Sequence, residues 1–469
     1  MPLDCHFCTN FATMNLTEAF IKQLQGLLPD EWEALTRAIT STEPSVAVRV
    51  NDARGVTVPE GARRVPWCHN GFYLEDRPAF TFDPDWHAGR YYVQDASSMF
   101  IAHVIRSLIS GPVRYLDLCA APGGKTTAAI QALPQHSLVV ANEIVPPRAH
   151  VLADNVIRWG NPRCVVTSNA PAQLGKLTHF FDVIAADVPC SGEGMMRKDD
   201  EAVAQWSPTL VNECAQRQCE ILTDVWQALR PGGLLIYSTC TYNRQENEEI
   251  ADFIVNELGA TSLEVPVEPS WNIHPAIGST CHCYRFMPHR VDGEGLFMAA
   301  FRKDGDSLRQ DVRIKEKTAK KADETVKKWL SKPDDFVLDQ QGDLLIALPQ
   351  DIRREVAALR SSLNVLHAGI ELATVMGRKT VPHHALAMSI ERAADAFPAC
   401  EVDYPTVLRY LRGESISIDG PRGYVLITHE GAALGLANNL GNRANNLYPK
   451  PLRILSTHLP DEKPKVSIH

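Results

Sequence analysis

The sequence predicts an α/β protein built on a Rossmann-like sheet, in which parallel strands alternate with helices. Between residues 113 and 301, short apolar runs alternate with segments of helical periodicity, and this alternation is typical of a doubly wound sheet. Several reactive side chains stand where the apolar runs end. Ligands of open parallel sheets bind at the carboxyl ends of the strands, so these side chains are candidates for a functional site.

The predicted elements follow one another in a regular order. Apolar runs predict strands over residues 113–118, 137–142, 164–167, 181–186, 234–238 and 296–301. Periodicity predicts helices over residues 126–133, 147–159, 210–229 and 245–258. Pro231, Gly232 and Gly233 are expected to break the chain before the fifth of these strands.

Length and composition narrow the class of protein. The chain has 469 residues, which predicts about three domains at roughly 150 residues each. No apolar run approaches the ~20 residues that a membrane span requires. The first 14 residues lack the pattern of a secretory signal, and the 12 cysteines are interpreted as reduced core or catalytic thiols. We therefore expect a cytoplasmic protein without membrane contact, with a monomer as the default.

A glycine-bearing loop follows the first predicted strand and reads Cys119-Ala120-Ala121-Pro122-Gly123-Gly124-Lys125. Its backbone amides can approach a ligand, but a triphosphate-binding loop would need glycine where Cys119 stands, and Gly-x-Gly-x-x-Gly is absent. Glu143 ends the next strand about 20 residues later, where an acid can accept hydrogen bonds from ribose hydroxyls. The pattern favours an adenosine cofactor without a pyrophosphate, and S-adenosylmethionine fits that description.

Two cysteines and one acid stand at the ends of later strands. Asp187 ends the fourth strand and Cys190 follows it, whereas Cys240 follows the fifth strand. A cysteine without further context is most often an inert core residue. Here both thiols are predicted to lie beside the cofactor loop, which favours a chemical role.

These motifs together resemble the RNA 5-methylcytosine methyltransferases of the NOL1/NOP2/Sun group. The resemblance covers roughly residues 14–303, with several motifs in the family's order. They are the stretch 91–98, the cofactor loop 119–125, Asp187-Val188-Pro189-Cys190-Ser191-Gly192-Glu193-Gly194, Ser238-Thr239-Cys240-Thr241 and the closing segment 285–303. The chain departs from the family at Val188, where alanine is usual, and near Asn169, where an acid on the adenine side is expected.

The resemblance implies S-adenosylmethionine as the cofactor and assigns a role to each motif. Cys240 is the expected nucleophile, which adds to C6 of cytosine and makes C5 nucleophilic. Asp187 is expected at the N3 and amine edge of the base, and Cys190 is expected to assist product release. The expected cofactor-binding residues are Cys119, Ala120, Ala121, Pro122, Gly123, Gly124, Lys125, Glu143, Asp187 and, in place of the missing acid, Asn169.

The target base has to be reached from the face of its ring, so it is expected to be single-stranded or flipped out of a helix. Arg197, Lys198, His289 and Arg290 are candidates for contacts with RNA, and each is equally well interpreted as a surface charge. The formal net charge of −9 argues against a surface covered with phosphate-binding groups. The base that removes the C5 proton is not identified by the sequence.

We expect five segments along the chain. They are a disordered leader at 1–13, an N-terminal α+β RNA-binding extension at 14–100, the methyltransferase catalytic domain at 101–305, a linker with a small α/β adaptor domain at 306–390, and a β-rich PUA-like RNA-binding domain at 391–469. The region 336–381 mixes short strands with a helix around 351–361. Short β runs with glycine and proline, among them 408–414 and 423–428, resemble the PUA-like tail of the bacterial small-subunit ribosomal RNA members.

Three hypotheses follow. The preferred one is an S-adenosylmethionine-dependent enzyme that forms 5-methylcytosine in small-subunit (16S) ribosomal RNA, naked or in the assembled subunit, through a covalent cysteine–C6 adduct. The alternatives are the same reaction on transfer RNA and a catalytically idle RNA-binding factor of ribosome assembly. Cys5 and Cys8 have metal-like spacing and could join Cys281 and Cys283, but a disordered leader or an upstream start codon is the simpler interpretation, and no metal is predicted.

Overall fold

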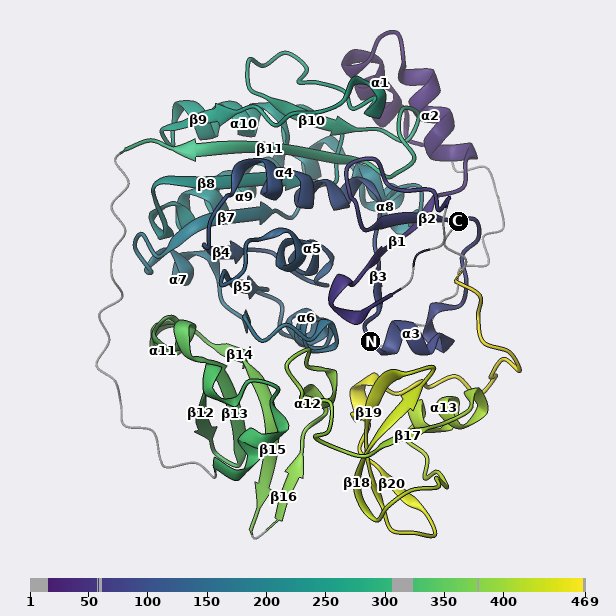
Figure 1. The fold of residues 1–469 in the computed structure, drawn as a ribbon. Coiled ribbons are helices and arrows are strands. Elements are labelled where there is room, and N and C mark those ends of the chain that lie inside the picture. The colour runs from purple at the N-terminus through teal and green to yellow at the C-terminus, as the bar shows by residue number, and fades with distance from the viewer. Residues whose placement is uncertain (1–15, 57, 59–60, 306–323, 378, 467–469) are drawn as a thin grey trace.

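The computed structural model describes residues 16–56, 58, 61–305, 324–377 and 379–466. Within these residues, a mixed sheet of nine strands forms the centre of the molecule (Figure 1). Five strands are parallel, in the spatial order β8 (Leu229–Thr239), β7 (Phe181–Asp187), β4 (Arg114–Asp117), β5 (Leu138–Asn142) and β6 (Cys164–Thr167). Antiparallel to β8 runs β11 (Leu296–Lys303), which pairs with β10 (Cys283–Phe286) and β9 (Ala260–Leu263). The predicted Rossmann-like sheet is confirmed.

Alternate residues of each strand point to opposite faces of the sheet. Both faces carry apolar side chains, and helices cover both of them. Tyr115 and Val139 belong to one buried cluster, whereas their neighbours Leu116 and Val140 belong to the other. The first cluster is covered by α4 (Phe100–Leu108), α5 (Gly124–Ala132) and α6 (Pro146–Trp159). The second is covered by α7 (Pro171–Gly175), α9 (Pro208–Val225) and α10 (Glu248–Asn256).

The predictions for the fifth strand and the helix before it were wrong in one respect. Helix α9 ends at Val225, a 3₁₀ turn covers Trp226–Ala228, and β8 begins at Leu229, so the Pro-Gly-Gly sequence lies inside the strand. The parallel register between β7 and β8 shifts between Phe181 and Val183 at this level. A Cβ atom on Gly233 would lie 3.0 Å from the carbonyl oxygen of Asp182, so glycine permits the close approach of the two strands.

The N-terminal extension consists of a helical pair and a small sheet. Its elements are α1 (Glu18–Leu27), α2 (Trp32–Ser41), β1 (Val46–Val50), β2 (Gly71–Leu74), α3 (Pro84–His87) and β3 (Tyr91–Val93), and the sheet order is β2-β1-β3. Arg49 of β1 is fully buried and donates from Nε to Gln94 Oε1 at 2.9 Å and from Nη2 to the carbonyl of Gly124 at 3.4 Å. The extension is thereby attached to the start of α5. The predicted leader at 1–13 lies outside the described residues.

The adaptor segment contributes a strand to the central sheet, which the sequence did not indicate. Its elements are β12 (Phe336–Gln341), β13 (Leu344–Pro349), α11 (Arg353–Ser362), β14 (Val365–Ala368), β15 (Ile370–Met376) and β16 (Lys379–Pro382). Strands β12, β13, β15 and β16 form a separate sheet, but β14 pairs antiparallel with β6. Leu359 of α11 is buried in the same cluster as Val165 of β6. The adaptor and the central sheet therefore share a core.

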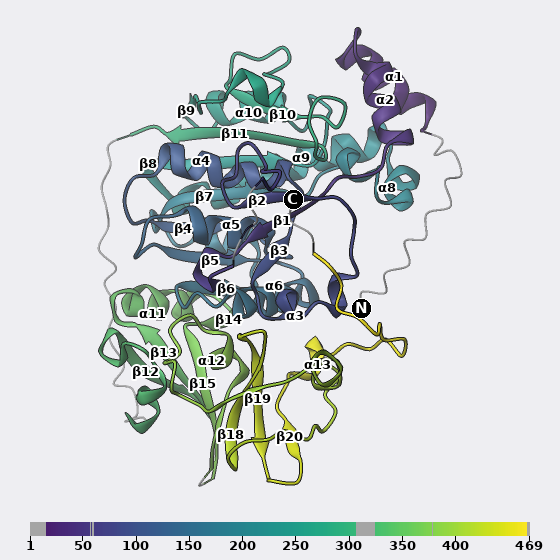
Figure 2. The ribbon, with the colours of Figure 1, turned by 45° about the vertical axis from the view of Figure 1, so that its right-hand side comes forward.

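The C-terminal segment forms a small sheet in the order β17-β18-β19-β20. Strands β18, β19 and β20 are labelled at the bottom of Figure 2. Its elements are α12 (His384–Met388), β17 (Ala399–Glu401), α13 (Tyr404–Leu411), β18 (Gly423–His429), β19 (Ala432–Asn439) and β20 (Ala444–Asn446). The prediction of a β run from Leu408 was wrong, because Leu408 to Leu411 belong to α13. Asp403 caps that helix by accepting a hydrogen bond from the amide of Thr406. Among the described residues, every helix is too short or too polar to cross a lipid bilayer.

The shared core predicts that a cavity in α11 destabilises the molecule. Leu359 is fully buried, so Leu359→Ala should lower the free energy of unfolding by about 3 kcal/mol. Arg354→Ala, at an exposed position of the same helix, should change it by less than about 0.5 kcal/mol. Chemical denaturation of both variants measures the difference. Equal stabilities of the two variants would show that α11 does not contribute to the core.

Candidate active site

A cavity of about 200 Å³ lies at the carboxyl ends of β4 and β7. Most of its wall comes from two sequence motifs, the predicted cofactor loop and the stretch from β3 to Ser98. The lining residues are Tyr92, Val93, Gln94, Asp95, Ser98, Asp117, Cys119, Ala120, Ala121, Pro122, Gly124, Lys125 and Asp187. The loop and Asp187 thus lie together at the sheet edge, while Gly123, Glu143 and Asn169 lie outside the lining. The stretch 91–98 had no predicted site role, although its similarity to a family element was a usable signal.

The backbone of the cofactor loop is held by its neighbours. Gly123 has a φ of 113° and forms the N-cap of α5, a conformation that favours glycine. The amide of Ala120 donates to the carbonyl of Asn142 at 2.8 Å, and Asn155 Nδ2 donates to the carbonyl of Pro122 at 2.6 Å. The loop therefore presents a fixed surface to the cavity. Burial raises the pKa of the Cys119 thiol in this loop, so the thiol stays protonated.

Asp187 is held from two sides. Lys125 Nζ donates to its Oδ2 at 2.8 Å, and Ser238 Oγ donates to its Oδ1 at 2.7 Å. Burial lowers the pKa of Lys125, but the adjacent Asp187 outweighs this effect, and the net shift is upward. The lysine is therefore charged, and its ion pair fixes the direction of the Asp187 carboxylate.

Asp117 is a site residue that the sequence reasoning missed. It ends β4, lines the cavity and is 1% exposed. Thr126 Oγ1 donates to its Oδ2 at 2.7 Å, whereas its buried Oδ1 has no hydrogen-bond partner among the described residues. Burial raises the pKa of Asp117 to about 7. The rule that selected Glu143 and Asp187, an acid at the end of a strand, could also have selected Asp117.

The two predicted cysteines are in contact. Cys190 Sγ lies 3.1 Å from Cys240 Sγ, and the backbone amide of Cys240 donates to Cys190 Sγ at 3.4 Å. Parallel pairing places Asp187 opposite Ser238, so the two loops that carry the cysteines leave the sheet at the same level. The hydrogen bond with Cys240 and then burial raise the pKa of Cys190. Cys190 is therefore a protonated thiol at neutral pH.

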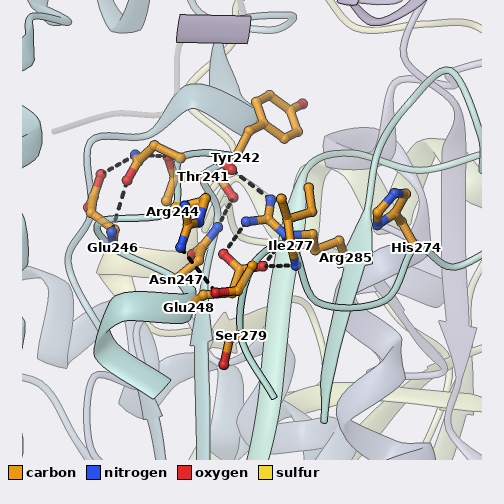
Figure 3. A network of polar contacts seen from close by, with 12 residues as sticks. Thr241, Tyr242, Arg244, Glu246, Asn247, Glu248, His274, Ile277, Ser279 and Arg285 are labelled. Carbon is orange, nitrogen blue, oxygen red and sulfur yellow. Dashed lines mark hydrogen bonds and ion pairs between the residues drawn. The ribbon is translucent and has the colours of Figure 1, made fainter. Parts of the chain in front are cut away.

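The chain after Cys240 is held by a buried ion pair (Figure 3). Arg285 of β10 donates from Nε to Glu248 Oε1 at 2.5 Å and from Nη1 to the carbonyl of Tyr242 at 2.6 Å. Asn247 accepts a hydrogen bond from Thr239 Oγ1 at 2.6 Å and donates to the carbonyl of Thr241 at 3.0 Å. The loop that carries Cys240 is thus fixed at both of its ends.

Glu143 and Asn169, two predicted cofactor contacts, have other partners in the structure. Glu143 is buried, and its Oε1 accepts the amide of Val145 at 3.0 Å. Asn169 donates from Nδ2 to the carbonyl of Asn364 at 3.1 Å and accepts the amide of Asn364 at 3.0 Å. Both ends of the Asn169 amide group therefore bind the residue that leads into β14. This side chain supports the edge of the sheet, and its contact with the adenine side of the cofactor stays a prediction.

The four charged residues that the sequence suggested for RNA contact are engaged inside the protein. Arg197 and Lys198 lie 3.6 and 3.2 Å from the carboxylate of Glu294, and the Arg197 side chain is 7% exposed. His289 lies 2.8 Å from Glu31, and Arg290 also pairs with Glu31. The two pairs with Glu31 join the catalytic domain to the loop between α1 and α2, whereas the two pairs with Glu294 lie within the catalytic domain. The prediction that they face RNA is not supported by this arrangement.

Of the four thiols suggested for a metal site, the structure describes Cys281 and Cys283. Cys5 and Cys8 lie outside the described residues. Cys281 donates to Asp252 Oδ1 at 3.7 Å, and Cys283 is buried in β10. Over the described part of the chain, no group of three or more His, Cys, Asp or Glu side chains is placed to hold a metal ion.

The buried Asp117 predicts a pH dependence of stability. Its pKa of about 7 in the folded chain exceeds the ordinary value of about 4 in the unfolded chain, so the folded chain retains this proton between pH 4 and 7. The contribution of Asp117 to the free energy of unfolding therefore falls as the pH rises through this window. Asp117→Asn should flatten the slope of stability against pH by at most about 1.4 kcal/mol per pH unit. Denaturation at several pH values tests this, and equal slopes would contradict it.

Models of three protein families match separate parts of the chain. They are described as 16S rRNA methyltransferase RsmB/F at residues 111–302, the N-terminal domain of 16S rRNA methyltransferase RsmF at 16–96, and the methyltransferase RsmF PUA domain at 397–454. Two solved proteins from Pyrococcus horikoshii share the fold. One is titled a methyltransferase homolog protein and is 23% identical, and the match covers 62% of this chain and 96% of that protein. The other is titled NSun6 with SFG and is 18% identical, and the match covers 62% of this chain and 99% of that protein. Both have a TM-score of 0.53.

Curated relatives match over nearly their whole length. A protein of Salmonella heidelberg is 30% identical over 93% of this chain and 96% of its own, and one of Erwinia tasmaniensis is 29% identical over 92% and 96%. Both are named ribosomal RNA small subunit methyltransferase F. Identity at this level, over more than nine tenths of both chains and across all three matched segments, shows that the chain belongs to the RsmF group of the RsmB/F family of RNA methyltransferases.

Proposed function

We propose that this chain is an S-adenosylmethionine-dependent enzyme that forms 5-methylcytosine in 16S ribosomal RNA through a covalent adduct between Cys240 and C6 of the base. The observation that carries the proposal is the pair of thiols 3.1 Å apart, on loops that leave neighbouring parallel strands beside the cavity. A nucleophile with an adjacent proton-bearing group is what addition to a ring, followed by elimination, requires.

The cavity suits a cofactor that carries positive charge and a ribose. Asp117 offers a buried carboxyl oxygen that has no hydrogen-bond partner among the described residues, and Asp187, at the end of the neighbouring strand β7, adds a carboxylate. Ala120, Ala121 and Pro122 give an apolar side that suits the uncharged parts of the ligand. We propose that the cofactor loop and these acids hold S-adenosylmethionine, which supplies the methyl group. Glu143 remains the proposed ribose contact because each carboxylate oxygen can accept more than one hydrogen bond.

In the proposed reaction the protein first activates C5 of the base. The Cys240 thiolate forms a bond to C6, and the electron pair of the C5–C6 double bond makes C5 nucleophilic. We propose that Asp187, held by Lys125 and Ser238, accepts a hydrogen bond from the exocyclic amine of cytosine, and that a proton between its carboxyl group and N3 completes the contact with this edge of the base. The rigid direction of this carboxylate orients the ring toward Cys240.

Release reverses the addition. Removal of the C5 proton re-forms the C5–C6 double bond, and the Cys240–C6 bond breaks with its electron pair returning to sulfur. Cys190 keeps its proton at neutral pH and lies 3.1 Å from that sulfur, so it is placed to protonate the departing thiolate. This geometry supports the proposed role of Cys190 in product release.

The proposed substrate rests on the relatives and on the tail. The curated relatives are named for the small ribosomal subunit, and the PUA domain model matches the C-terminal sheet. Ribosomal RNA is therefore the proposed partner. Transfer RNA as the substrate and a catalytically idle assembly factor are the other outcomes that an experiment has to distinguish.

Bisulfite sequencing of total RNA distinguishes these outcomes. Cells that carry Cys240→Ala in place of the parent protein should lose one or more 5-methylcytosines from 16S ribosomal RNA and keep all others. Removal of the nucleophile should lower the rate of methylation by at least about 10³-fold, because the covalent route is lost, so the affected cytosines should read as unmethylated. Loss of a 5-methylcytosine from a transfer RNA would show that transfer RNA is the substrate. An unchanged pattern in every RNA would contradict the enzymatic hypothesis.

The two cysteines should give opposite results in an adduct assay. Cys190→Ala leaves the attacking thiol in place and removes the proposed proton donor, so a covalent protein–RNA complex should accumulate. Cys240→Ala should form no such complex, because the attacking sulfur is absent. Small ribosomal subunits from a strain without this protein serve as the substrate, and a denaturing gel shows the adduct as a shifted band. A Cys190→Ala protein that turns over without a shifted band would remove Cys190 from the release step.

A further inference from the structure

We propose that Glu246 and Gln218 are positioning residues for Cys190, because they hold the two peptide groups that flank it and thereby set its thiol against Cys240. The inference deepens the proposed function and rests on the roles proposed above for the two thiols. Neither side chain lines the cavity, so both would act through Cys190 and not through contact with the substrate.

Two side chains from outside the Cys190 loop form hydrogen bonds with the backbone on either side of Cys190. Glu246 Oε2 accepts the backbone amide of Ser191 at 2.9 Å, and Gln218 Nε2 donates to the carbonyl of Pro189 at 3.0 Å. The same Gln218 Nε2 donates to Glu246 Oε2 at 2.8 Å, which joins the two contacts into one unit. Both side chains are completely buried. The peptide groups before and after Cys190 are therefore held by groups that water cannot replace.

The unit is anchored to the sheet that carries the other cysteine. Tyr237 of β8 donates its hydroxyl proton toward Gln218 Oε1 at 3.0 Å and the carbonyl of Glu246 at 2.6 Å. An amide group that accepts at Oε1 and donates at Nε2 has a single orientation. Gln218 comes from α9. Glu246, which Figure 3 labels, comes from the loop between Cys240 and α10. Helix α9, strand β8 and the loop before α10 thus all contribute to the contacts that hold the Cys190 loop.

A second set of contacts joins the residues that follow the two cysteines. Asn243 Nδ2 donates to Glu246 Oε1 at 2.8 Å and lies 3.0 Å from Thr241 Oγ1. Ser191 Oγ and Thr241 Oγ1 lie 3.0 Å apart and share a hydrogen bond. The position of Cys190 relative to Cys240 is therefore set by one buried network, in which the Glu246 carboxylate accepts a backbone amide of the Cys190 loop.

The electrostatics of the network favour the thiol form of Cys190. The titratable groups that face this thiol are Cys240, Glu246 and Tyr237. The hydrogen bond with Cys240 and burial raise the pKa of Cys190 most, and the negative charge of Glu246 adds to them. Glu246 therefore preserves the proton that the release step requires, in addition to fixing the loop.

Replacement of Glu246 should impair release more than attack. Glu246→Gln keeps the size of the side chain but removes its charge and turns one oxygen into a donor that faces Gln218 or Asn243. Turnover should fall at least about tenfold, because hydrogen bonds to a charged group are lost. The covalent adduct should accumulate, as we expect for Cys190→Ala. Glu249→Gln, at an exposed position three residues later, is the matched control and should behave like the parent protein.

Gln218→Met provides a second variant that does not remove a charge. It deletes the bond to the carbonyl of Pro189 and should also trap the adduct, at a turnover reduced by about five- to tenfold. Binding of S-adenosylhomocysteine should be unchanged in both variants, because the cavity contains neither residue. This binding, measured by calorimetry, shows that the variant proteins are folded. If Glu246→Gln does not fold, the result for Gln218→Met decides the inference.

A measurement without RNA separates this inference from the proposed function. In a Cys240→Ser background, alkylation of Cys190 by iodoacetamide is followed against pH by peptide mass spectrometry. Glu246→Gln should shift the midpoint of alkylation to lower pH, and Glu249→Gln should leave it in place. The inference is overturned if Glu246→Gln leaves the midpoint of alkylation unchanged, and if Glu246→Gln and Gln218→Met both turn over like the parent protein while Cys190→Ala still traps the adduct. Absence of an adduct even in Cys190→Ala overturns the proposed release step instead.

Discussion

The site depends on the parallel pairing of β7 with β8. This pairing sets Asp187 opposite Ser238, and the hydrogen bond of 2.7 Å between their side chains repeats the backbone register at the sheet edge. Cys190 stands three residues beyond Asp187, and Cys240 two residues beyond Ser238. A slip of one residue in either strand would turn its side chains to the other face of the sheet. The contact between the two thiols is therefore a consequence of strand register.

Several carboxyl groups lie around this edge of the sheet, fully buried as in Asp117 or partly buried as in Asp187, and a charge shielded from water needs stabilisation. Each has a different solution. Asp187 is neutralised by Lys125, and Asp117 takes up a proton more readily than an ordinary aspartate because burial raises its pKa. Glu193 is completely buried and accepts hydrogen bonds from the amides of Tyr242 and Asn243 at 2.7 and 2.9 Å. Donors aimed at buried carboxylates fix the loops that supply them, so charge burial and loop geometry are a single constraint.

The sequence predicted those parts of the fold and site that local pattern determines. Apolar runs and helical periodicity located the strands and helices of the central sheet, and the position of residues at strand ends located Asp187, Cys190 and Cys240. Features that depend on distant pairings were not predicted. The antiparallel addition of β14 to β6 joins residues about two hundred positions apart, and the engagement of Asn169 by Asn364 follows from it. Likewise, the partners of Arg197 and Arg290 are acids remote in sequence, so charge alone could not show whether these residues face solvent.

The same long-range contacts determine how the C-terminal modules relate to the site. Strand β14 belongs to the central sheet, the amide of Ile390 donates to the carbonyl of Gly160 at 3.1 Å, and His87 Nδ1 lies 2.9 Å from the hydroxyl of Tyr448. Ala88, next to His87, is buried in the core of the C-terminal sheet. These contacts join the C-terminal modules to the N-terminal extension and to the central sheet, so the C-terminal sheet is held in a fixed position relative to the site. Under the proposed function, an RNA held by the tail is presented to Cys240 at a distance set by the protein, and the shape of the RNA then selects the base.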